Sequence, residues 1–237
     1  MFGYYGFGPF MIDYWYIILV IPAVIFSVWC SANVNSTFSK YSKLQSHANM
    51  TGAQVAEEIL RNNGIYDVEI LKGRGKLTDH YDPRKKVLVL SETVYDKTDV
   101  AALGVAAHEV GHAIQHNTGY SFLKLRNSIV GITNFASSIS PVFLILGLFS
   151  GSSIIINIAI ILFAAAVVFQ LITLPVEFDA SKRALANLEG SGILQQDEVQ
   201  SSKKVLNAAA MTYVAGLIVA LASFLRILFI FGGRRND

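Results

Sequence analysis

The chain has 237 residues, of which 53% are hydrophobic and 15% are charged, and its formal net charge is +2. So apolar a composition excludes an ordinary soluble domain of this length. The charge excess is small and no stripe of Lys and Arg alternates with aromatic residues, which excludes nucleic acid as a partner. The single cysteine, Cys30, excludes a disulfide framework and a thiolate metal site.

Four apolar segments are long enough to cross a bilayer as helices: residues 14–34, 129–149, 153–174 and 211–231. No basic residue precedes the first segment, so we expect a retained anchor and not a cleaved signal peptide. The aromatic and glycine-rich start, residues 1–10, is typical of anchoring at the membrane interface. A tight turn at Ser150-Gly-Ser-Ser153 predicts that the second and third segments form a helical hairpin.

Nearly all lysines and arginines fall in two stretches, residues 35–127 and 182–204. An odd number of spans precedes the first stretch and a hairpin separates the two. Both stretches should therefore lie on one side of the membrane, which the positive-inside rule makes cytoplasmic. Arg226, near the end of the last span, is expected to snorkel toward the interface. Arg234 and Arg235 then fall on the opposite side.

The sequence thus predicts a mostly α integral membrane protein, in which four transmembrane helices carry a small α+β cytoplasmic domain. We expect five parts: an N-terminal segment with the first span (1–34), the cytoplasmic domain (35–127), the hairpin of the second and third spans (128–174), a second cytoplasmic segment (175–210), and the fourth span with the C-terminus (211–237).

The cytoplasmic domain begins with a predicted helix from Thr51 to Gly64, which has an N-cap residue at its start and a glycine at its end. Two short strands are expected at residues 68–71 and 87–90, separated by a turn-rich segment, residues 73–83. An Ala-rich helix follows, with Thr98 or Asp99 as its N-cap.

This last helix carries the motif His108-Glu109-Val110-Gly111-His112. Histidines four residues apart lie on one helix face, so both imidazoles can reach a single ion. Glu109 is then placed to accept a proton from water, as the general base of a metallopeptidase. Gly104 and Gly111 are poor helix formers, and their presence predicts that another backbone approaches the helix closely.

A catalytic zinc needs three protein ligands and one open position. His116 continues the spacing of the two histidines, but three such positions spread over roughly 12 Å of helix, which is too far for one ion. We therefore expect the third ligand to be an acid on another helix. Glu177, just beyond the third span, is favoured, and Asp179 is the alternative. One Zn²⁺ per chain is the predicted cofactor.

Substrate-binding residues are also predicted. In zincins an edge strand beside the zinc pairs with an extended peptide, and we assign this role to residues 87–91, including Val87, Leu88 and Val89. A central strand fits the same residues equally well. His80 or Tyr81 is a candidate donor to the oxyanion of the reaction. Asp79 and Asp82 flank His80 and are expected to orient it, and the alternative is an ordinary turn histidine paired with one of them.

The chain resembles the YugP-like neutral zinc metallopeptidases, a bacterial family of membrane-bound proteins. The resemblance runs through Met50-Thr-Gly-Ala-Gln-Val-Ala56, Leu77-Thr-Asp-His-Tyr-Asp-Pro-Arg84, Val105-Ala-Ala-His-Glu-Val-Gly-His-Ala-Ile-Gln115 and Leu174-Pro-Val-Glu-Phe-Asp-Ala-Ser181. The last two blocks are also similar to the HtpX-type membrane gluzincins. This similarity implies zinc ligation by two histidines and a glutamate, with a glutamate base: His108, His112, Glu177 and Glu109.

One position departs from the HtpX-type pattern, which has an aspartate four residues after the ligand glutamate. That position is Ser181 in this chain, and the nearest acid is Asp179, on a different face of the helix. An acid there would orient a ligand histidine from the second layer of the site. Asp179 is therefore the candidate for this supporting role.

Together these features predict a multi-pass zinc metalloendopeptidase of the bacterial plasma membrane, whose small α+β cytoplasmic domain is a zincin-like catalytic domain. Its active site is expected to face the cytoplasm and to cleave peptides or membrane proteins. Two alternatives stay open. One is a non-catalytic zinc-binding membrane adaptor or chaperone, and the other is a zinc hydrolase of a non-peptide amide. The sequence favours no particular oligomeric state.

Overall fold

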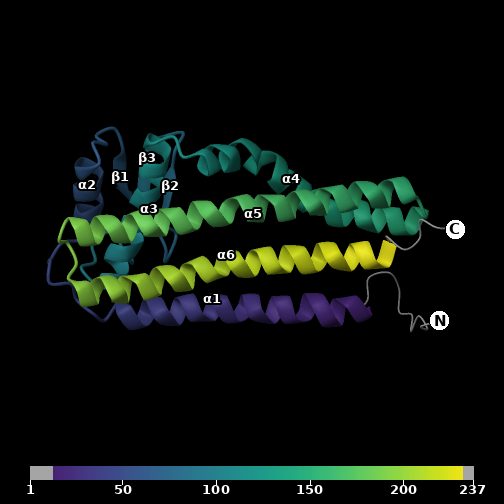
Figure 1. Cartoon of the computed structure of the whole chain (residues 1–237), viewed down its shortest axis with the longest axis horizontal. Helices are drawn as coiled ribbons and strands as arrows, with labels where there is room; N and C mark the ends of the chain where they lie inside the picture. The colour runs from purple at the N-terminus through teal and green to yellow at the C-terminus, as the bar shows by residue number, and fades with distance from the viewer. Residues whose placement is uncertain (1–12, 232–237) are drawn as a thin grey trace. The chain divides into compact units, whose positions relative to one another are not determined.

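The computed structural model describes residues 13–231 (Figure 1). The predicted interfacial anchor at residues 1–10 lies outside this range, as do Arg234 and Arg235. The chain is mostly helical. In chain order, the elements are η1 (Tyr16–Val20), α1 (Ile21–Tyr41), α2 (Gly52–Asn62), β1 (Glu69–Lys72), β2 (His80–Asp82), β3 (Val87–Leu90), α3 (Val100–Asn117), α4 (Ser121–Ser150), α5 (Ser153–Gly190) and α6 (Gln196–Phe231).

The chain divides into two compact units. The first comprises Met1–Trp29, Arg126–Ile172 and Tyr213–Asp237, and the second comprises Cys30–Leu125 and Thr173–Thr212. Among residues 13–231, four helical stretches are long and apolar enough to cross a membrane: Tyr16–Tyr41, Ser121–Ser150, Ser153–Gly190 and Gln196–Phe231. Each predicted apolar segment falls almost entirely within one of them.

In the first unit, many large apolar side chains face outward, and the buried cluster formed by Val20, Ala23 and Ala222 is small. Exposed examples from all four spans are Ile25, Val28, Ile132, Phe135, Phe149, Ile154, Ile161 and Phe229. A surface this apolar suits lipid and not water. The expected hairpin turn is present, because α4 ends at Ser150, Gly151 adopts a positive φ of 66° and α5 begins at Ser153.

Arg226 forms an ion pair that the sequence did not indicate. Its Nε donates a hydrogen bond to Asp13 Oδ2 at 2.7 Å, and its guanidinium lies 5.0 Å from the centre of the Tyr16 ring. Both partners belong to the first unit. The charge of Arg226 is therefore neutralised within the protein, and snorkelling to the interface is not needed to explain it.

The second unit holds the hydrophobic core, and Figure 1 shows α2, the three strands and α3 clustered together within it. Thr51 caps α2 as predicted: it accepts a hydrogen bond from the Gln54 backbone, and the Gln54 side chain accepts one from the Thr51 backbone. The strand order is β1-β3-β2, with β1 parallel and β2 antiparallel to β3. Both predicted strands form, with β1 shifted by one residue.

The prediction that residues 87–91 form an edge strand is wrong. Val87, Leu88 and Val89 lie in β3, which is paired on both sides. The missed element is β2, which folds from the turn-rich segment. Asp82 Oδ1 accepts hydrogen bonds from the backbone of Arg84 and Lys85 and so stabilises the turn between β2 and β3. The edge strand that contacts α3 is therefore β2.

The helix that carries the motif is almost entirely buried. Asp99 is its N-cap, and its carboxylate accepts a hydrogen bond from Ala102 N at 2.9 Å. The expected close approach of another backbone is confirmed at Gly111, whereas at Gly104 the nearest atoms belong to a side chain. A Cβ at Gly111 would lie 2.5 Å from the Ala180 carbonyl oxygen of α5, and one at Gly104 would overlap Ser202 of α6. Two other helices thus pack directly against α3.

Candidate metal centre

Three potential ligands converge where α3 meets α5. His108 and His112 are one helical turn apart on α3, and Glu177 reaches them from α5. Glu177 Oε2 lies 3.4 Å from His108 Nε2 and 3.6 Å from His112 Nε2, and one potential ligand atom from each residue lies within 4.8 Å of the others. In sequence, 65 residues separate His112 from Glu177, so only the packing of α5 on α3 brings the carboxylate to the histidines.

The environment of the group favours positive charge. Burial by itself lowers the pKa of His112, but Glu177, Glu109 and the hydrogen bond with Gln115 together outweigh this effect, and the net pKa of His112 is raised above its ordinary value. The carboxylate of Glu109 acts in the same direction. A cation, whether a proton or a metal ion, is therefore stabilised between these side chains.

The other ring nitrogen of His108 contacts a serine. His108 Nδ1 lies 3.1 Å from the hydroxyl of Ser181, which is on α5 one turn after Glu177. Because Nε2 is directed toward Glu177, an Nδ1–H group can donate to the serine oxygen and leave a lone pair on Nε2. A serine at this position can therefore orient the imidazole, which is the task expected of the aspartate in the HtpX-type pattern.

His112 is oriented by a buried glutamine. Gln115, which is 0% exposed, accepts at Oε1 from His112 Nδ1 at 3.0 Å. Its Nε2 donates to the Val176 carbonyl at 2.7 Å and to Asp179 Oδ2 at 2.9 Å. Since both amide hydrogens meet acceptors on α5, only Oε1 remains for the histidine. His112 must therefore donate from Nδ1 and present a lone pair at Nε2.

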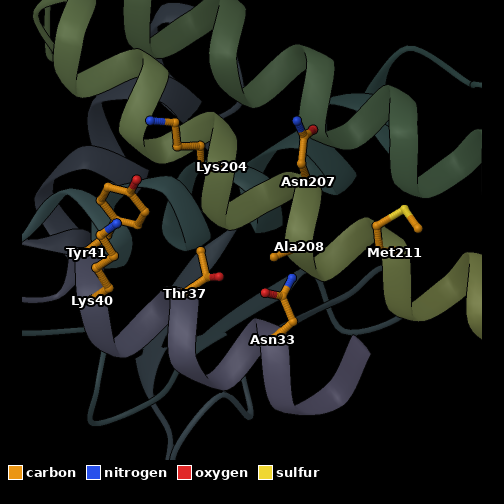
Figure 2. A pocket seen from close by; sticks show the side chains of 8 residues that line it. All are labelled: Asn33, Thr37, Lys40, Tyr41, Lys204, Asn207, Ala208 and Met211. Carbon is orange, nitrogen blue, oxygen red and sulfur yellow. The ribbon is translucent and has the colours of Figure 1, made fainter. Parts of the chain in front are cut away.

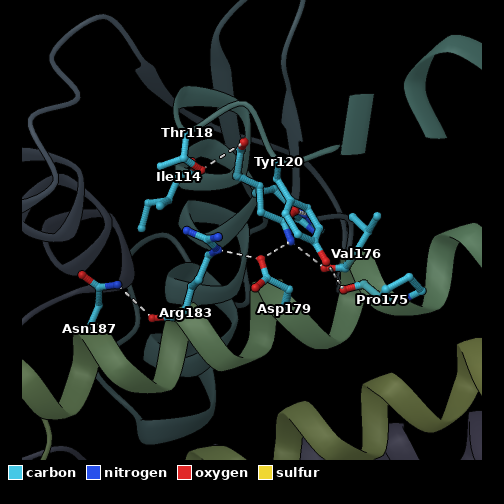
Figure 3. A network of polar contacts seen from close by, with 10 residues as sticks. Ile114, Thr118, Tyr120, Pro175, Val176, Asp179, Arg183 and Asn187 are labelled. Atoms are coloured by element: carbon cyan, nitrogen blue, oxygen red, sulfur yellow. Dashed lines mark hydrogen bonds and ion pairs between the residues drawn. The ribbon is translucent and has the colours of Figure 1, made fainter. Parts of the chain in front are cut away.

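Asp179, which accepts a hydrogen bond from Gln115, belongs to a wider network of polar contacts that includes Arg183 (Figure 3). Asp179 Oδ2 also accepts a hydrogen bond from Arg183 Nε at 2.6 Å. The Arg183 guanidinium lies 5.8 Å from the ring centre of Tyr120, whose hydroxyl donates to the Pro175 carbonyl at 3.4 Å. Asp179 thus lies next to the Gln115 amide and not next to a histidine, so its link to the ligand group is indirect.

Glu109 follows His108 directly and is largely buried, at 9% exposure. Its charge affects the pKa of His112, which places the carboxylate within electrostatic range of the ligand group. Glu109 therefore lies on the same helix as the two histidines, at the position expected for the general base.

The two candidate oxyanion donors differ in position. Tyr81 points from β2 toward α3, and its hydroxyl lies 2.9 Å from His116 Nδ1, one turn after His112. Burial raises the pKa of Tyr81 to about 12, so its hydroxyl stays protonated and able to donate. His80 is exposed, and its Nδ1 lies 2.9 Å from the Thr78 carbonyl oxygen. Successive strand residues face opposite sides, which explains the difference.

The acids beside His80 do not orient it, contrary to expectation. Asp79 accepts hydrogen bonds from the backbone and hydroxyl of Ser91 at 2.7 and 2.9 Å, and burial raises the pKa of Asp79. Asp82 binds the backbone of the β2–β3 turn. Both carboxylates serve the local structure of the sheet.

Two imidazoles and a carboxylate, with the far nitrogen of each imidazole engaged, form a donor set that suits zinc. Within residues 13–231, no fourth His, Cys, Asp or Glu joins this group. Three protein ligands leave a coordination position for water or substrate, which is the arrangement of catalytic rather than structural zinc sites. The donor set therefore fits a catalytic zinc ion.

Sequence reasoning missed the contributions of Gln115 and Ser181. Gln115 follows His112 by three residues, which places the two side chains on one helix face. A glutamine in an otherwise Ala-rich buried helix was the available signal, because a buried amide requires partners. Ser181 was identified only as a departure from a pattern, since its partner on α3 is 73 residues away.

Comparison with known proteins bears on this geometry. A family model described as "Putative neutral zinc metallopeptidase" matches residues 16–232. The chain is also 47% identical over 222 residues to a Bacillus subtilis (strain 168) protein named "Putative membrane protease YugP", and the match covers 94% of this chain and 99% of that protein. No solved structure matches the chain.

Proposed function

This chain belongs to the neutral zinc metallopeptidase family, and on that basis we propose that it is a membrane-bound zinc endopeptidase. The single observation that carries the proposal is the convergence of His108, His112 and Glu177 beside the acid Glu109. A purely structural zinc site would be closed by a fourth ligand and would need no neighbouring base. This donor set instead leaves room for a water and a substrate carbonyl.

The residues divide the chemistry among them. His108, His112 and Glu177 would hold a zinc ion, which would supply Lewis acidity to the scissile carbonyl and to the attacking water. The Glu109 carboxylate accepts the proton of the attacking water and then gives it to the departing amine. The Tyr81 hydroxyl, which burial keeps protonated, is the better placed of the two candidate donors to the oxyanion.

An extended peptide would bind along β2. This strand is at an edge of the sheet and contacts α3, so its outer backbone groups can pair with a substrate strand. Hydrogen bonding to the backbone requires several consecutive peptide units, so cleavage should depend on substrate length. The same dependence would argue against the hydrolysis of a small non-peptide amide.

We place the active site on the cytoplasmic side, because the basic residues of 35–127 and 182–204 flank the spans on the side of the metal centre. A Cys30→Ser background allows single cysteines to report this orientation. Tyr66→Cys, at a position 81% exposed, should resist a membrane-impermeant maleimide in intact cells, whereas Ser153→Cys in the hairpin turn should react. The opposite labelling pattern would overturn the orientation.

The test of the activity is cleavage of an unfolded model protein by the purified, zinc-loaded chain in detergent. Glu109→Gln should keep zinc and lower kcat by about a hundredfold to ten-thousandfold, because it removes the proton acceptor but no ligand. Glu57→Gln, an exposed acid on α2, is the matched control. A Glu109→Gln protein with the activity of the control would exclude this mechanism, and zinc binding without cleavage by the unaltered chain would favour an adaptor.

A further inference from the structure

A pocket of about 340 Å³ lies between α1 and α6 in the second unit, and its lining residues are not used by the peptidase chemistry (Figure 2). The α1 side contributes Asn33, Thr37, Lys40 and Tyr41, and the α6 side contributes Lys204, Asn207, Ala208 and Met211. None of these residues belongs to the metal centre or to the network that supports it.

The charge of the pocket is unbalanced. Lys40 and Lys204 lie with their ammonium groups 5.4 and 5.9 Å from the ring centre of Tyr41. No carboxylate lines the pocket, and within residues 13–231 neither lysine forms an ion pair. By contrast, Lys72 and Lys86 of the same unit pair with Asp96 and Asp67. Two positive charges without an acidic partner favour the binding of an anionic ligand in this pocket.

Neutral hydrogen-bond donors accompany these charges. The side-chain amides of Asn33 and Asn207 and the hydroxyl of Thr37 line the same pocket. Ammonium groups combined with amide and hydroxyl donors provide the contacts that a phosphate group needs, because its oxygens accept several hydrogen bonds at once. The pocket is therefore suited to a phosphate ester.

The position of the pocket along the helices indicates that the phosphate belongs to a lipid headgroup. On α1 the lining residues lie at and beyond the end of the apolar segment 14–34, and on α6 they lie before and at the start of the segment 211–231. Both sets occupy the one or two turns next to a membrane span, which is the depth of lipid headgroups. A soluble phosphate would not require this location.

The pocket lining is charged at one end and apolar at the other, as the binding of a lipid requires. Figure 2 shows both lysines and Tyr41 at one end of the pocket and Met211 at the other. Ala208 and Met211 form the apolar part of the lining, at the point where the span of α6 begins. A headgroup can thus meet charge while the attached acyl chains meet apolar side chains.

We propose that this pocket is a binding site for an anionic glycerophospholipid, whose phosphate contacts Lys40 and Lys204 and whose acyl chains extend past Met211. The lipid would join the end of α1 to the start of α6. The site is separate from the peptidase centre, so the proposal does not depend on catalysis.

The experiment measures lipid binding to the full chain. Protein purified in detergent and stripped of lipid is titrated with phosphatidylglycerol or phosphatidylcholine, and bound lipid is counted by native mass spectrometry. The unaltered chain should retain one phosphatidylglycerol and bind phosphatidylcholine more weakly. Lys40→Gln/Lys204→Gln should bind phosphatidylglycerol about 30-fold more weakly, the product of roughly a fivefold loss for each lysine near a membrane surface.

The matched control is Lys43→Gln/Lys203→Gln, which removes the same charge from neighbouring positions that do not line the pocket. It should bind like the unaltered chain. A second variant, Asn207→Asp, keeps both lysines but adds a negative charge to the lining, and it should also weaken binding. Zinc content and helical circular dichroism identify any variant that fails to fold.

Three results would overturn the proposal. Equal loss in the control pair would mean that general surface charge attracts the lipid. Undiminished binding by both Lys40→Gln/Lys204→Gln and Asn207→Asp would place the lipid elsewhere. Complete displacement of phosphatidylglycerol by millimolar inorganic phosphate would show that the pocket recognises the free anion and that the acyl chains contribute nothing.

Discussion

The hydroxyl of Ser181 lies 3.1 Å from Nδ1 of His108, on the side of the imidazole away from Glu177. This serine occupies the position where the HtpX-type pattern has an aspartate. A neutral hydroxyl accepts the Nδ1–H hydrogen bond without adding negative charge next to the ligand group. The centre therefore holds its first histidine with a serine and its second with a glutamine, and each of these contacts can be tested separately.

Ser181→Ala should weaken zinc binding by about tenfold, because His108 loses the group that fixes its orientation. Competition against a fluorescent zinc chelator measures the change in Kd. Ser201→Ala, which removes a hydroxyl that donates to the Asp197 carbonyl within α6, is the control. Unchanged affinity in Ser181→Ala would mean that packing alone orients the imidazole.

Gln115→Leu should have a larger effect, about tenfold to a hundredfold on zinc affinity. The change leaves the Nδ1–H of His112 without an acceptor and also deprives the Val176 carbonyl and Asp179 of their donor. The exposed Gln200→Leu controls for the added apolar surface. Because Gln115 acts through His112, zinc affinity and not only turnover should fall. Full zinc affinity with reduced turnover would contradict this positioning role.

Glu177 and Asp179 of α5 should differ sharply in their effect on zinc binding. Glu177→Gln should lose stoichiometric zinc, since it removes the carboxylate that lies within 3.6 Å of both histidines. Asp179→Asn should retain zinc with reduced affinity, because Asp179 contacts Gln115 and Arg183. Metal analysis after gel filtration measures both. Retained zinc in Glu177→Gln and lost zinc in Asp179→Asn would reverse the assignment of the third ligand.

Gly111→Ala should disrupt the centre although residue 111 itself is no ligand. The added Cβ would lie 2.5 Å from the backbone oxygen of Ala180, which cannot rotate away, so α5 must shift from α3 together with its ligand. We expect a lower Tm and weaker zinc binding. Gly190→Ala is the control, because a Cβ there meets nothing within 4 Å. Equal behaviour of the two variants would contradict the close packing.

The metal-free protein should become less stable as pH rises. The folded-state pKa of His112 is raised above its ordinary value of 6.5, so folding binds a proton at this site. Its stabilising contribution is fully present below the unfolded pKa and is lost as pH increases through the higher folded pKa. Zinc needs the neutral imidazole, so zinc should raise Tm more at pH 8 than at pH 6.

Thermal melts in detergent between pH 6 and pH 9, with zinc and with a chelator, measure both trends. His112→Gln should flatten the slope of Tm against pH in the metal-free protein. If Tm of this variant still falls with pH as steeply as that of the unaltered protein, the proton taken up on folding binds to another group.

Much of the architecture follows from the sequence because it depends on local or periodic features. Hydrophobic runs of about 20 residues predict spans, since a bilayer core sets the length of a helix that crosses it. The spacing of His108 and His112 predicts a shared face from helix geometry alone. The N-cap at Thr51 and the close approach at Gly111 are equally local signals, and the structure confirms both.

Only the tertiary structure decided the strand order and the hydrogen-bond partners of the histidines, because both depend on contacts between distant segments. Strand order is not encoded by alternation within a strand, so Val87–Leu90 could be recognised as a strand but its central place could not. The partners of the histidines are likewise determined by how α5 packs on α3. Ser181 and the Gln115–Asp179 contact exist only because a glycine at position 111 lets two helix backbones meet, and neither pairing leaves a trace in residue spacing.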